Sequence, residues 1–302
     1  MNFIIDFIKG IFVGIANVIP GVSGGTMAVS FGIYDKLVGS ISDLFKRFKE
    51  CFKTLLPIVL GMAFGIVSFT FVIPYMLENI PFITACIFTG LILGGIPALL
   101  KNLKTHAASD VRTPNYVNLT VFVVLLAISL IMPFLNGDKE SGMLLEANPY
   151  TVVMVMIMGM IAAAAMVIPG VSGSLMLMIF GYYFGIITAV RDFISALKSF
   201  DMKVMIDRGL VLAPFAIGCL AGLFLISKLI SWLLKRFPLA TYWGILGLVA
   251  ASPISVFYKI NEEYPLSGTS VVNILIGVIS LIAAVVLTLY IGSLGSKEKE
   301  AL

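Results

Sequence analysis

Charged side chains are scarce in this sequence, and the residue types that most often bind metals are scarcer still. Only 12% of the 302 residues are Asp, Glu, Lys or Arg, about half the share that is typical of a soluble domain. There is one His, and the three Cys residues (Cys51, Cys86 and Cys219) are far apart in the chain. This spacing indicates neither a disulfide framework nor a zinc site.

Hydrophobic residues, in contrast, make up 60% of the chain, and the mean hydropathy is +1.08. Such a chain has too little polar surface to cover a water-soluble globule, and several apolar runs approach the ~20 residues that cross a bilayer as a helix. Lipid offers no partners to backbone N–H and C=O groups, so each run is expected to be helical. The prediction is an all-α, polytopic integral membrane protein. Its apolar segments are 3–19, 22–45, 54–77, 82–100, 117–135, 150–168, 170–194, 209–234, 239–258 and 270–292.

A repeated motif organises the chain. The heptapeptide VIPGVSG occupies residues 18–24 and returns at 167–173, an offset of 149 residues. Further along, PIVLGMAFG (57–65) parallels PFAIGCLAG (214–222) at an offset of 157. We therefore predict a first repeat at 1–135, an external linker at 136–149, and a second repeat at 150–302 that ends in a short cytoplasmic tail.

The distribution of Lys and Arg predicts how these repeats cross the membrane. The basic loop 46–53 is expected in the cytoplasm and the acidic linker outside. The remaining loops alternate correctly if 3–19 with 22–45, and 150–168 with 170–194, each form a hairpin that returns to the side from which it came. The loop 198–209 is then external, and the two repeats are inverted. Each repeat would contain one broken, re-entrant-like hairpin and three spanning helices, an arrangement typical of transporters. No removable signal peptide is expected, because the N-terminus lacks a basic stretch and a cleavage site.

The Pro-Gly motif itself suggests an anion site. Pro ends one helix and Gly permits a sharp turn, so a second helix is expected to begin near Ser23 or Gly24. The first turn of a helix exposes unpaired N–H groups that attract anions, and glycines permit close approach. One such kink in a membrane helix is usually only a kink, but two inverted copies favour a site. The candidate phosphate-binding residues are Pro20, Gly21, Ser23, Gly24, Gly25 and Thr26, with Pro169, Gly170, Ser172, Gly173 and Ser174.

Two charged residues are further candidates for head-group binding or ion coupling. Arg191 is the one Arg within an apolar run, where charges are commonly functional. It lies roughly 25 Å from Ser174 along a straight helix, so a phosphate contact and an interfacial, snorkelling position both remain open. Asp35 lies ~13 Å from Thr26 by the same measure, and either a coupling proton or an exposed helix-end carboxylate would suit it.

The motifs IPGVSGGT and GIYDKL in the first half, and IPGVSGS in the second, resemble those of the bacterial polyprenyl-phosphate transporter family. The resemblance covers nearly the whole chain. It implies that a polyprenyl phosphate, undecaprenyl phosphate in particular, is flipped across the bacterial cytoplasmic membrane and returned to the inner leaflet. The implied partners are this lipid and the bilayer, without nucleic acid, cofactor, metal or catalytic residue. Ser174 and Leu175 replace Gly25 and Thr26 in the second copy, so the two phosphate cradles are not expected to be equivalent.

Two alternatives belong to other classes. A small-anion channel or exchanger would also aim Gly- and Ser-rich helix starts at an ion, and competition by a lipid phosphate would separate it from a lipid transporter. The motif also resembles undecaprenyl pyrophosphate phosphatase, a membrane enzyme. Gly24 stands where that enzyme's loop has Arg, no Glu pair matches its ExxxE motif, and His106 lies in a polar loop. Without an assembled base or nucleophile, we do not expect an enzyme.

Overall fold

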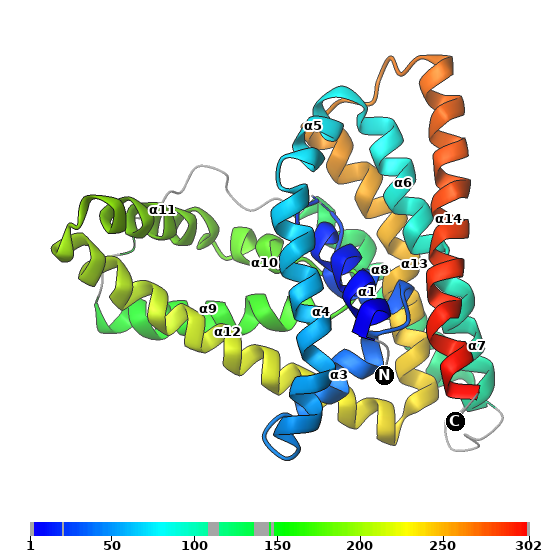
Figure 1. Ribbon diagram of the computed structural model, residues 1–302, viewed down its shortest axis with the longest axis horizontal. Helices are drawn as coiled ribbons and strands as arrows, with labels where there is room; N and C mark the ends of the chain where they lie inside the picture. The colour runs from blue at the N-terminus through cyan, green and yellow to red at the C-terminus, as the bar shows by residue number, and fades with distance from the viewer. Residues whose placement is uncertain (1–2, 20, 108–114, 136–144, 146–147, 301–302) are drawn as a thin grey trace. The chain divides into compact units, whose positions relative to one another are not determined.

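The computed structural model describes residues 3–19, 21–107, 115–135, 145 and 148–300, and its regular elements are all helical within these ranges (Figure 1). Pro20 and most of the predicted linker 136–149 lie outside the described residues. The helices are α1 (Phe3–Ala16), α2 (Gly24–Ser30), α3 (Tyr34–Ser42), α4 (Phe48–Phe69), α5 (Val72–Asn79), α6 (Pro81–Leu93), α7 (Ile96–Ala107), α8 (Asn115–Ile131), the 3-10 turn η1 (Met132–Phe134), α9 (Pro149–Val167), α10 (Gly173–Ile179), α11 (Tyr183–Ser199), α12 (Met202–Arg236), α13 (Pro238–Glu263) and α14 (Val271–Glu300).

The helices confirm the prediction of an all-α, multi-pass membrane protein. Seven helices of the described chain are long and apolar enough to cross a membrane. These spans are Phe48–Phe69, Pro81–Thr105, Tyr116–Phe134, Pro149–Val167, Met202–Arg236, Pro238–Glu263 and Val271–Leu294. α10 and α11 pass the same test together but are bent by 111° at the break between them. α1 has 14 residues, fewer than the ~20 that a span requires.

The sequence segments 22–45 and 170–194 differ from the structure, because each is interrupted by a helix break. α2 ends where Gly32 adopts a φ of +68°, and α10 ends where Gly181 adopts +77°. At each break, two successive backbone N–H groups donate to carbonyl oxygens of the short helix that has just ended. Those of Gly32 and Gly181 do so at 3.0 Å, and those of the residues that follow them at 2.9 Å. This is the Schellman arrangement, which needs a residue with positive φ and therefore favours Gly. Gly32 and Gly181 are related by the same offset of 149 residues as the repeated heptapeptide.

Three predicted loops are also shorter than expected. The basic loop 46–53 lies mostly within α4, which begins at Phe48. The helix α7 continues to Ala107, into a stretch that was expected to begin a polar loop at residue 101. The expected external loop 198–209 is reduced to the junction between α11 and α12, where Phe200 adopts a left-handed φ of 54°. Neither Pro nor Gly occurs between residues 101 and 107 or between 198 and 208, so the helices extend into these polar stretches, and the second stretch is interrupted only at Phe200.

The described chain forms two compact units. Unit 1 contains Met1–Pro133, Ile168–Gly170 and Lys228–Leu302, and unit 2 contains Phe134–Val167 and Val171–Ser227. Within unit 1, α6 packs against α14 and α13 packs against α8, so helices from both predicted repeats share one core (Figure 1). The compact units therefore follow different boundaries from the repeats, whose division at 136–149 remains a prediction from sequence similarity.

Matching glycines pack one helix pair in each unit. In unit 1, Gly61 of α4 lies so close to the carbonyl oxygen of Phe7 in α1 that a Cβ would overlap it. In unit 2, Gly218 of α12 lies in the same way against the carbonyl oxygen of Met156 in α9. These pairs are related by the sequence offsets of 157 and 149 residues. The same backbone-to-backbone packing thus occurs in both repeats, whereas their inversion remains a prediction.

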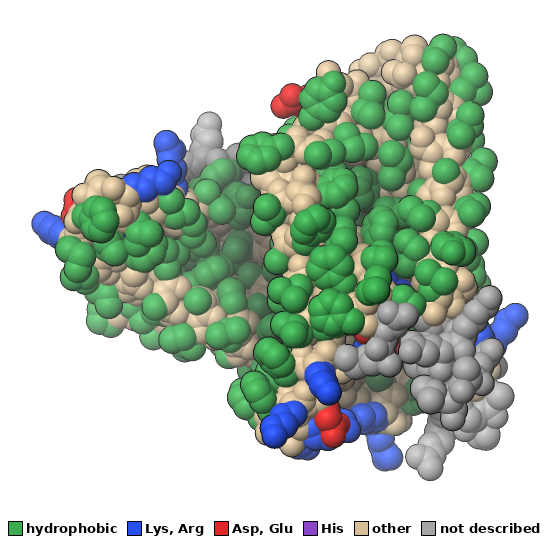
Figure 2. Space-filling model, viewed as in Figure 1, with side chains coloured by type: hydrophobic (Ala, Val, Ile, Leu, Met, Phe, Trp, Pro, Cys, Tyr) green, Lys and Arg blue, Asp and Glu red, His purple; other side chains and the backbone are tan. Residues whose placement is uncertain are grey.

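The surface of unit 1 is suited to lipid. Figure 2 shows hydrophobic side chains spread over α4 and α14, and Lys and Arg gathered near the junction of α3 and α4. Exposed basic residues at that junction include Lys46, Arg47 and Lys49. Charged groups inside the unit are paired, as in the ion pair between Lys36 of α3 and the buried Asp6 of α1. Pairing of this kind is expected, because an isolated buried charge is costly.

Candidate functional site: two Pro-Gly turns on one helix

The glycines of both Pro-Gly turns pack against α13 within unit 1. Gly21 has a φ of +79° and Gly170 a φ of +75°, a conformation that L side chains rarely adopt. A Cβ on Gly21 would lie 2.9 Å from the carbonyl oxygen of Ser255, and one on Gly170 would lie 2.8 Å from that of Leu248. These two carbonyls are seven residues, roughly 10 Å, apart along the helix. Both turns therefore require glycine, and α13 aligns them.

A buried network of hydroxyl groups joins the two motif copies. The backbone N–H of Gly170 donates to Thr26 Oγ1 at 2.7 Å, and the same hydroxyl lies 3.4 Å from Ser252 Oγ of α13. Ser129 of α8 donates to the carbonyl oxygens of Gly170 and Leu248, both at 3.4 Å. Thr26 and Ser129 are fully buried. The Thr26 hydroxyl therefore holds the second turn against the first.

The first short helix begins without a side-chain cap. Ser23 occupies the N-cap position of α2 with extended backbone angles, but its side chain makes no cap hydrogen bond within the described chain. It points instead to the carbonyl oxygen of Ile168 at 3.5 Å. Gly24, Gly25 and Thr26 form the first turn of the helix and are buried. An uncapped first turn leaves donor groups available to an anion.

The second short helix, in unit 2, begins differently. Ser172 caps α10 by accepting the N–H of Leu175 at 3.4 Å, and its hydroxyl lies 2.9 Å from that of Ser174. Ser172 is half-buried and Ser174 is exposed, whereas Ser23 and Thr26 of the first copy are buried. The two copies are therefore unequal both in capping and in burial.

Two of the motif glycines serve packing. A Cβ on Gly24 would lie 2.8 Å from the side-chain oxygen of Asn17, and one on Gly173 would lie 2.6 Å from the carbonyl oxygen of Ala162. The space beside each glycine is therefore filled by protein atoms. Any anion must approach from the N–H side of the turn, and substitution here would disturb packing before it affected binding.

The two charged candidates lie in different surroundings. Asp35, exposed at the start of α3, accepts a hydrogen bond of 2.5 Å from the Tyr242 hydroxyl of α13. Both residues line a cavity of about 40 Å³ in unit 1. Arg191 is exposed on α11, and it is Arg208 of α12 that pairs with Asp192, at 3.0 Å. Functional roles for Asp35 and Arg191 remain predictions.

Sequence reasoning missed the contribution of α13. Ser252, Ser255 and Lys259 follow one another at spacings of three and four residues, which places them on one face of the helix. Ser252 contacts Thr26, whereas Ser255 and Lys259 contact Gly21. Within the apolar segment 239–258, Ser252 was a sequence signal for the contact with Thr26. The contacts with Gly21 come from the backbone carbonyl of Ser255 and the stem of Lys259, which the pattern of polar residues does not mark.

The described chain contains seven candidate spans and two broken helices, and its two Pro-Gly turns are aligned on one helix. These features are typical of a multi-pass membrane protein of the transporter type. The family model described as undecaprenyl phosphate translocase-like matches residues 13–271. The chain belongs to this family.

Two curated relatives cover most of the chain. A polyprenyl-phosphate transporter of Staphylococcus aureus is 32% identical over 278 residues, which cover 91% of this chain and 93% of the relative. A polyprenyl-phosphate transporter of Vibrio cholerae is 29% identical over 263 residues, or 82% of this chain and 76% of the relative. No solved structure matches the chain.

Proposed function

We propose that this protein moves a polyprenyl monophosphate across the bacterial cytoplasmic membrane. Undecaprenyl phosphate is the proposed substrate, and its return from the outer to the inner leaflet is the proposed direction. Family membership and the names of both relatives support transport of a polyprenyl phosphate by this chain, as a transporter and not as an enzyme. The single structural observation that carries the proposal is the alignment of the turns at Gly21 and Gly170 on α13.

The phosphate is the part of the substrate that needs a protein path. A charged group is costly to bring into hydrocarbon unless it is paired and hydrogen-bonded, whereas the isoprenoid chain is soluble there. We propose that each motif copy can bind the phosphate at the first turn of its own short helix, through Gly24 and Gly25 in α2 and through Gly173 and Ser174 in α10. Ser23 and Ser172 would add hydroxyl donors, and the turns at Gly21 and Gly170 would set the direction of each helix start. Pro20 and Pro169 remain candidates predicted from the motif. The tail would remain in lipid.

Leaflet-specific transport in liposomes tests this proposal. Purified protein is reconstituted with undecaprenyl phosphate, and the lipid in the outer leaflet is measured with an impermeant phosphate-binding reagent. We expect exchange between leaflets that scales with the amount of protein and is inhibited by an excess of a second polyprenyl phosphate. Undecaprenol, which lacks the phosphate, should not inhibit.

The same liposomes separate the alternatives. Conduction of chloride or inorganic phosphate without movement of the lipid would favour an anion channel and contradict the proposal. Release of phosphate from undecaprenyl pyrophosphate, in proportion to protein and lost on mutation of the motif, would favour a phosphatase. Protein inactivated by heat before reconstitution provides the control for leakage.

A further inference from the structure

A lysine on α13 lies directly beside the first Pro-Gly turn. A Cβ on Gly21 would lie 3.0 Å from Cβ and 3.3 Å from Cγ of Lys259, so the lysine stem packs against the turn itself. Lys259 lies near the C-terminal end of α13, one residue beyond the apolar segment 239–258. A lysine at this end of a spanning helix can hold its ammonium group at the membrane interface, the level at which a lipid phosphate lies.

The Lys259 ammonium has an anionic partner in this structure. Its Nζ lies 2.7 Å from Oε2 of Glu262, and the two side chains are 19% and 21% exposed. The ammonium carries three donors and also lies 5.8 Å from the centre of the Tyr258 ring. The cation is thus held beside the turn by an acceptor that another anion can replace.

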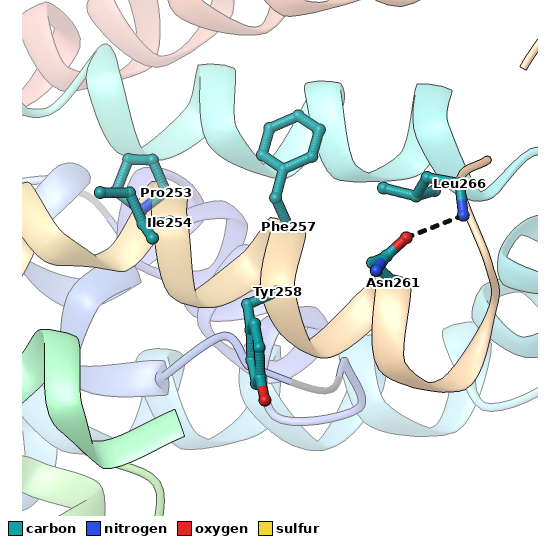
Figure 3. A pocket seen from close by; sticks show the side chains of 6 residues that line it. All are labelled: Pro253, Ile254, Phe257, Tyr258, Asn261 and Leu266. Carbon is teal, nitrogen blue, oxygen red and sulfur yellow. Dashed lines mark hydrogen bonds between the residues drawn. The ribbon is translucent and has the colours of Figure 1, made fainter. Parts of the chain in front are cut away.

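An apolar groove begins at the same tyrosine. It has a volume of about 470 Å³ and is lined by Pro253, Ile254, Phe257, Tyr258, Asn261 and Leu266 (Figure 3). This volume is within the range of small-ligand sites. Hydrogen bonding from the Leu266 N–H to Asn261 Oδ1, at 3.0 Å, closes one end. The groove is therefore lined mainly by apolar side chains, and the Lys259 ammonium, which does not line it, lies 5.8 Å from the centre of the Tyr258 ring.

This pairing of one cation with one apolar groove fits a single chemical class, an amphiphile with one anionic head and a hydrocarbon chain. We propose that Lys259 binds the phosphate of a polyprenyl monophosphate in exchange for Glu262, while the first part of the isoprenoid chain enters the groove. The inference rests on the proposed function and adds the residue at which the phosphate is first bound. Glu262 holds the lysine in place until substrate displaces it.

If the ion pair between Lys259 and Glu262 were purely structural, the expected effect of replacing Glu262 on lipid affinity would have the opposite sign. If the pair only stabilises the end of α13, removing either member removes the same interaction, and both substitutions act in the same direction. If Glu262 competes with the substrate, its removal frees the cation and strengthens binding. The signs of the two effects therefore distinguish the two roles.

The test measures the affinity of purified full-length protein for undecaprenyl phosphate in nanodiscs, for the wild type, Lys259→Gln and Glu262→Gln. We expect Lys259→Gln to weaken binding about tenfold or more, the value of a hydrogen bond to a charged group. Glu262→Gln should tighten it about two- to fivefold, the range for a partly exposed ion pair. Lys53→Gln, which removes an exposed lysine of α4, is the matched control and should leave affinity unchanged. Thermal unfolding checks that each variant is folded.

A second variant addresses the groove. Ile254 is 54% exposed, so Ile254→Trp fills the groove without crowding the core. It should weaken binding of undecaprenyl phosphate and also that of geranyl phosphate, whose short chain corresponds to the part that enters the groove, but should leave the binding of inorganic phosphate unchanged. Inorganic phosphate should compete only weakly with either lipid, and stronger competition would contradict a lipid site.

The outcomes separate this inference from the proposed function. If the wild type binds undecaprenyl phosphate and both Lys259→Gln and Glu262→Gln weaken it, or neither changes it, the exchange is disproved while transport stands. If the folded wild type binds undecaprenol as tightly as undecaprenyl phosphate, the proposed function itself is contradicted. Opposite signs for the two variants support the exchange.

Discussion

The backbone N–H of Gly170 donates a 2.7 Å hydrogen bond to the hydroxyl of Thr26, a residue 144 positions earlier in the chain. One partner belongs to the second Pro-Gly turn and the other to the first short helix. The Thr26 hydroxyl also lies 3.4 Å from that of Ser252 on α13. One buried side chain therefore connects both copies of the repeated motif to the helix on which their glycines pack.

Thr26→Val tests this connection. Valine keeps the shape of the side chain but leaves the Gly170 N–H without its buried acceptor, which costs roughly 1–3 kcal/mol. We expect a lower free energy of unfolding in detergent, together with slower transport of undecaprenyl phosphate. Thr26→Ser keeps the hydroxyl, so it should retain most of the stability and most of the transport rate.

Thr120→Val is the matched control, because Thr120 is exposed on α8 and its hydroxyl donates to Tyr116 of its own helix. Its effect should remain within about 0.5 kcal/mol, as for most surface substitutions. Equal stability of Thr26→Val and Thr120→Val would contradict the structural role of the Thr26 hydroxyl.

Much of the fold was predictable because its strongest signals are local. Apolar length predicts the helices, and the repeated heptapeptide predicts the two turns where Gly21 and Gly170 adopt positive φ. The segments 22–45 and 170–194 were expected to be continuous helices, but each is broken at a glycine, Gly32 or Gly181. This signal is equally local, because the two glycines occupy matching positions in the two repeats. Local patterns such as these are visible in one sequence.

The remaining features depend on contacts between distant segments. Gly90 and Gly94 are spaced as in a close helix contact, and both lie against α14, but the pattern does not indicate which helix is the partner. For the same reason, the sequence did not show that Thr26 contacts Ser252 or that Gly24 faces Asn17. The candidate site was therefore predictable as a motif but not as a set of neighbours.

Gly21→Ala should be destabilising for two reasons. Its φ of +79° is unfavourable for alanine, and the new Cβ would lie 2.9 Å from the Ser255 carbonyl oxygen. We expect a loss of about 1–3 kcal/mol in the free energy of unfolding. Gly39→Ala in α3 is the control: no atom of the described chain lies within 4 Å of its Cβ position, and alanine favours a helix. A variant Gly21→Ala as stable as Gly39→Ala would show that the turn can relax.

Gly61→Ala and Gly218→Ala should have matching effects if the two helix pairs are equivalent. Each new Cβ would overlap a backbone carbonyl oxygen of the facing helix, that of Phe7 or of Met156. Backbone cannot move aside as a flexible side chain can, so each change should cost about 1–3 kcal/mol. Unfolding followed by circular dichroism in detergent measures both. Gly292→Ala in α14 is the control and should be neutral, because no described atom lies within 4 Å of its Cβ position. A neutral result for only one of Gly61→Ala and Gly218→Ala would argue against equivalent packing.

The inversion of the repeats is tested by the location of two matched junctions. Positive charge predicts that Lys49, exposed at the start of α4, lies in the cytoplasm. The repeat then requires Lys203, exposed at the start of α12, to lie outside. Single cysteines are introduced as Lys49→Cys and Lys203→Cys in a background where Cys51, Cys86 and Cys219 are replaced by Ser. An impermeant maleimide applied to intact cells should label the residue at 203 only, and after the membrane is permeabilised it should label both. A parent chain without cysteine provides the background signal. Labelling of both positions in intact cells, or of neither, would place the two junctions on one side of the membrane and contradict the inverted arrangement.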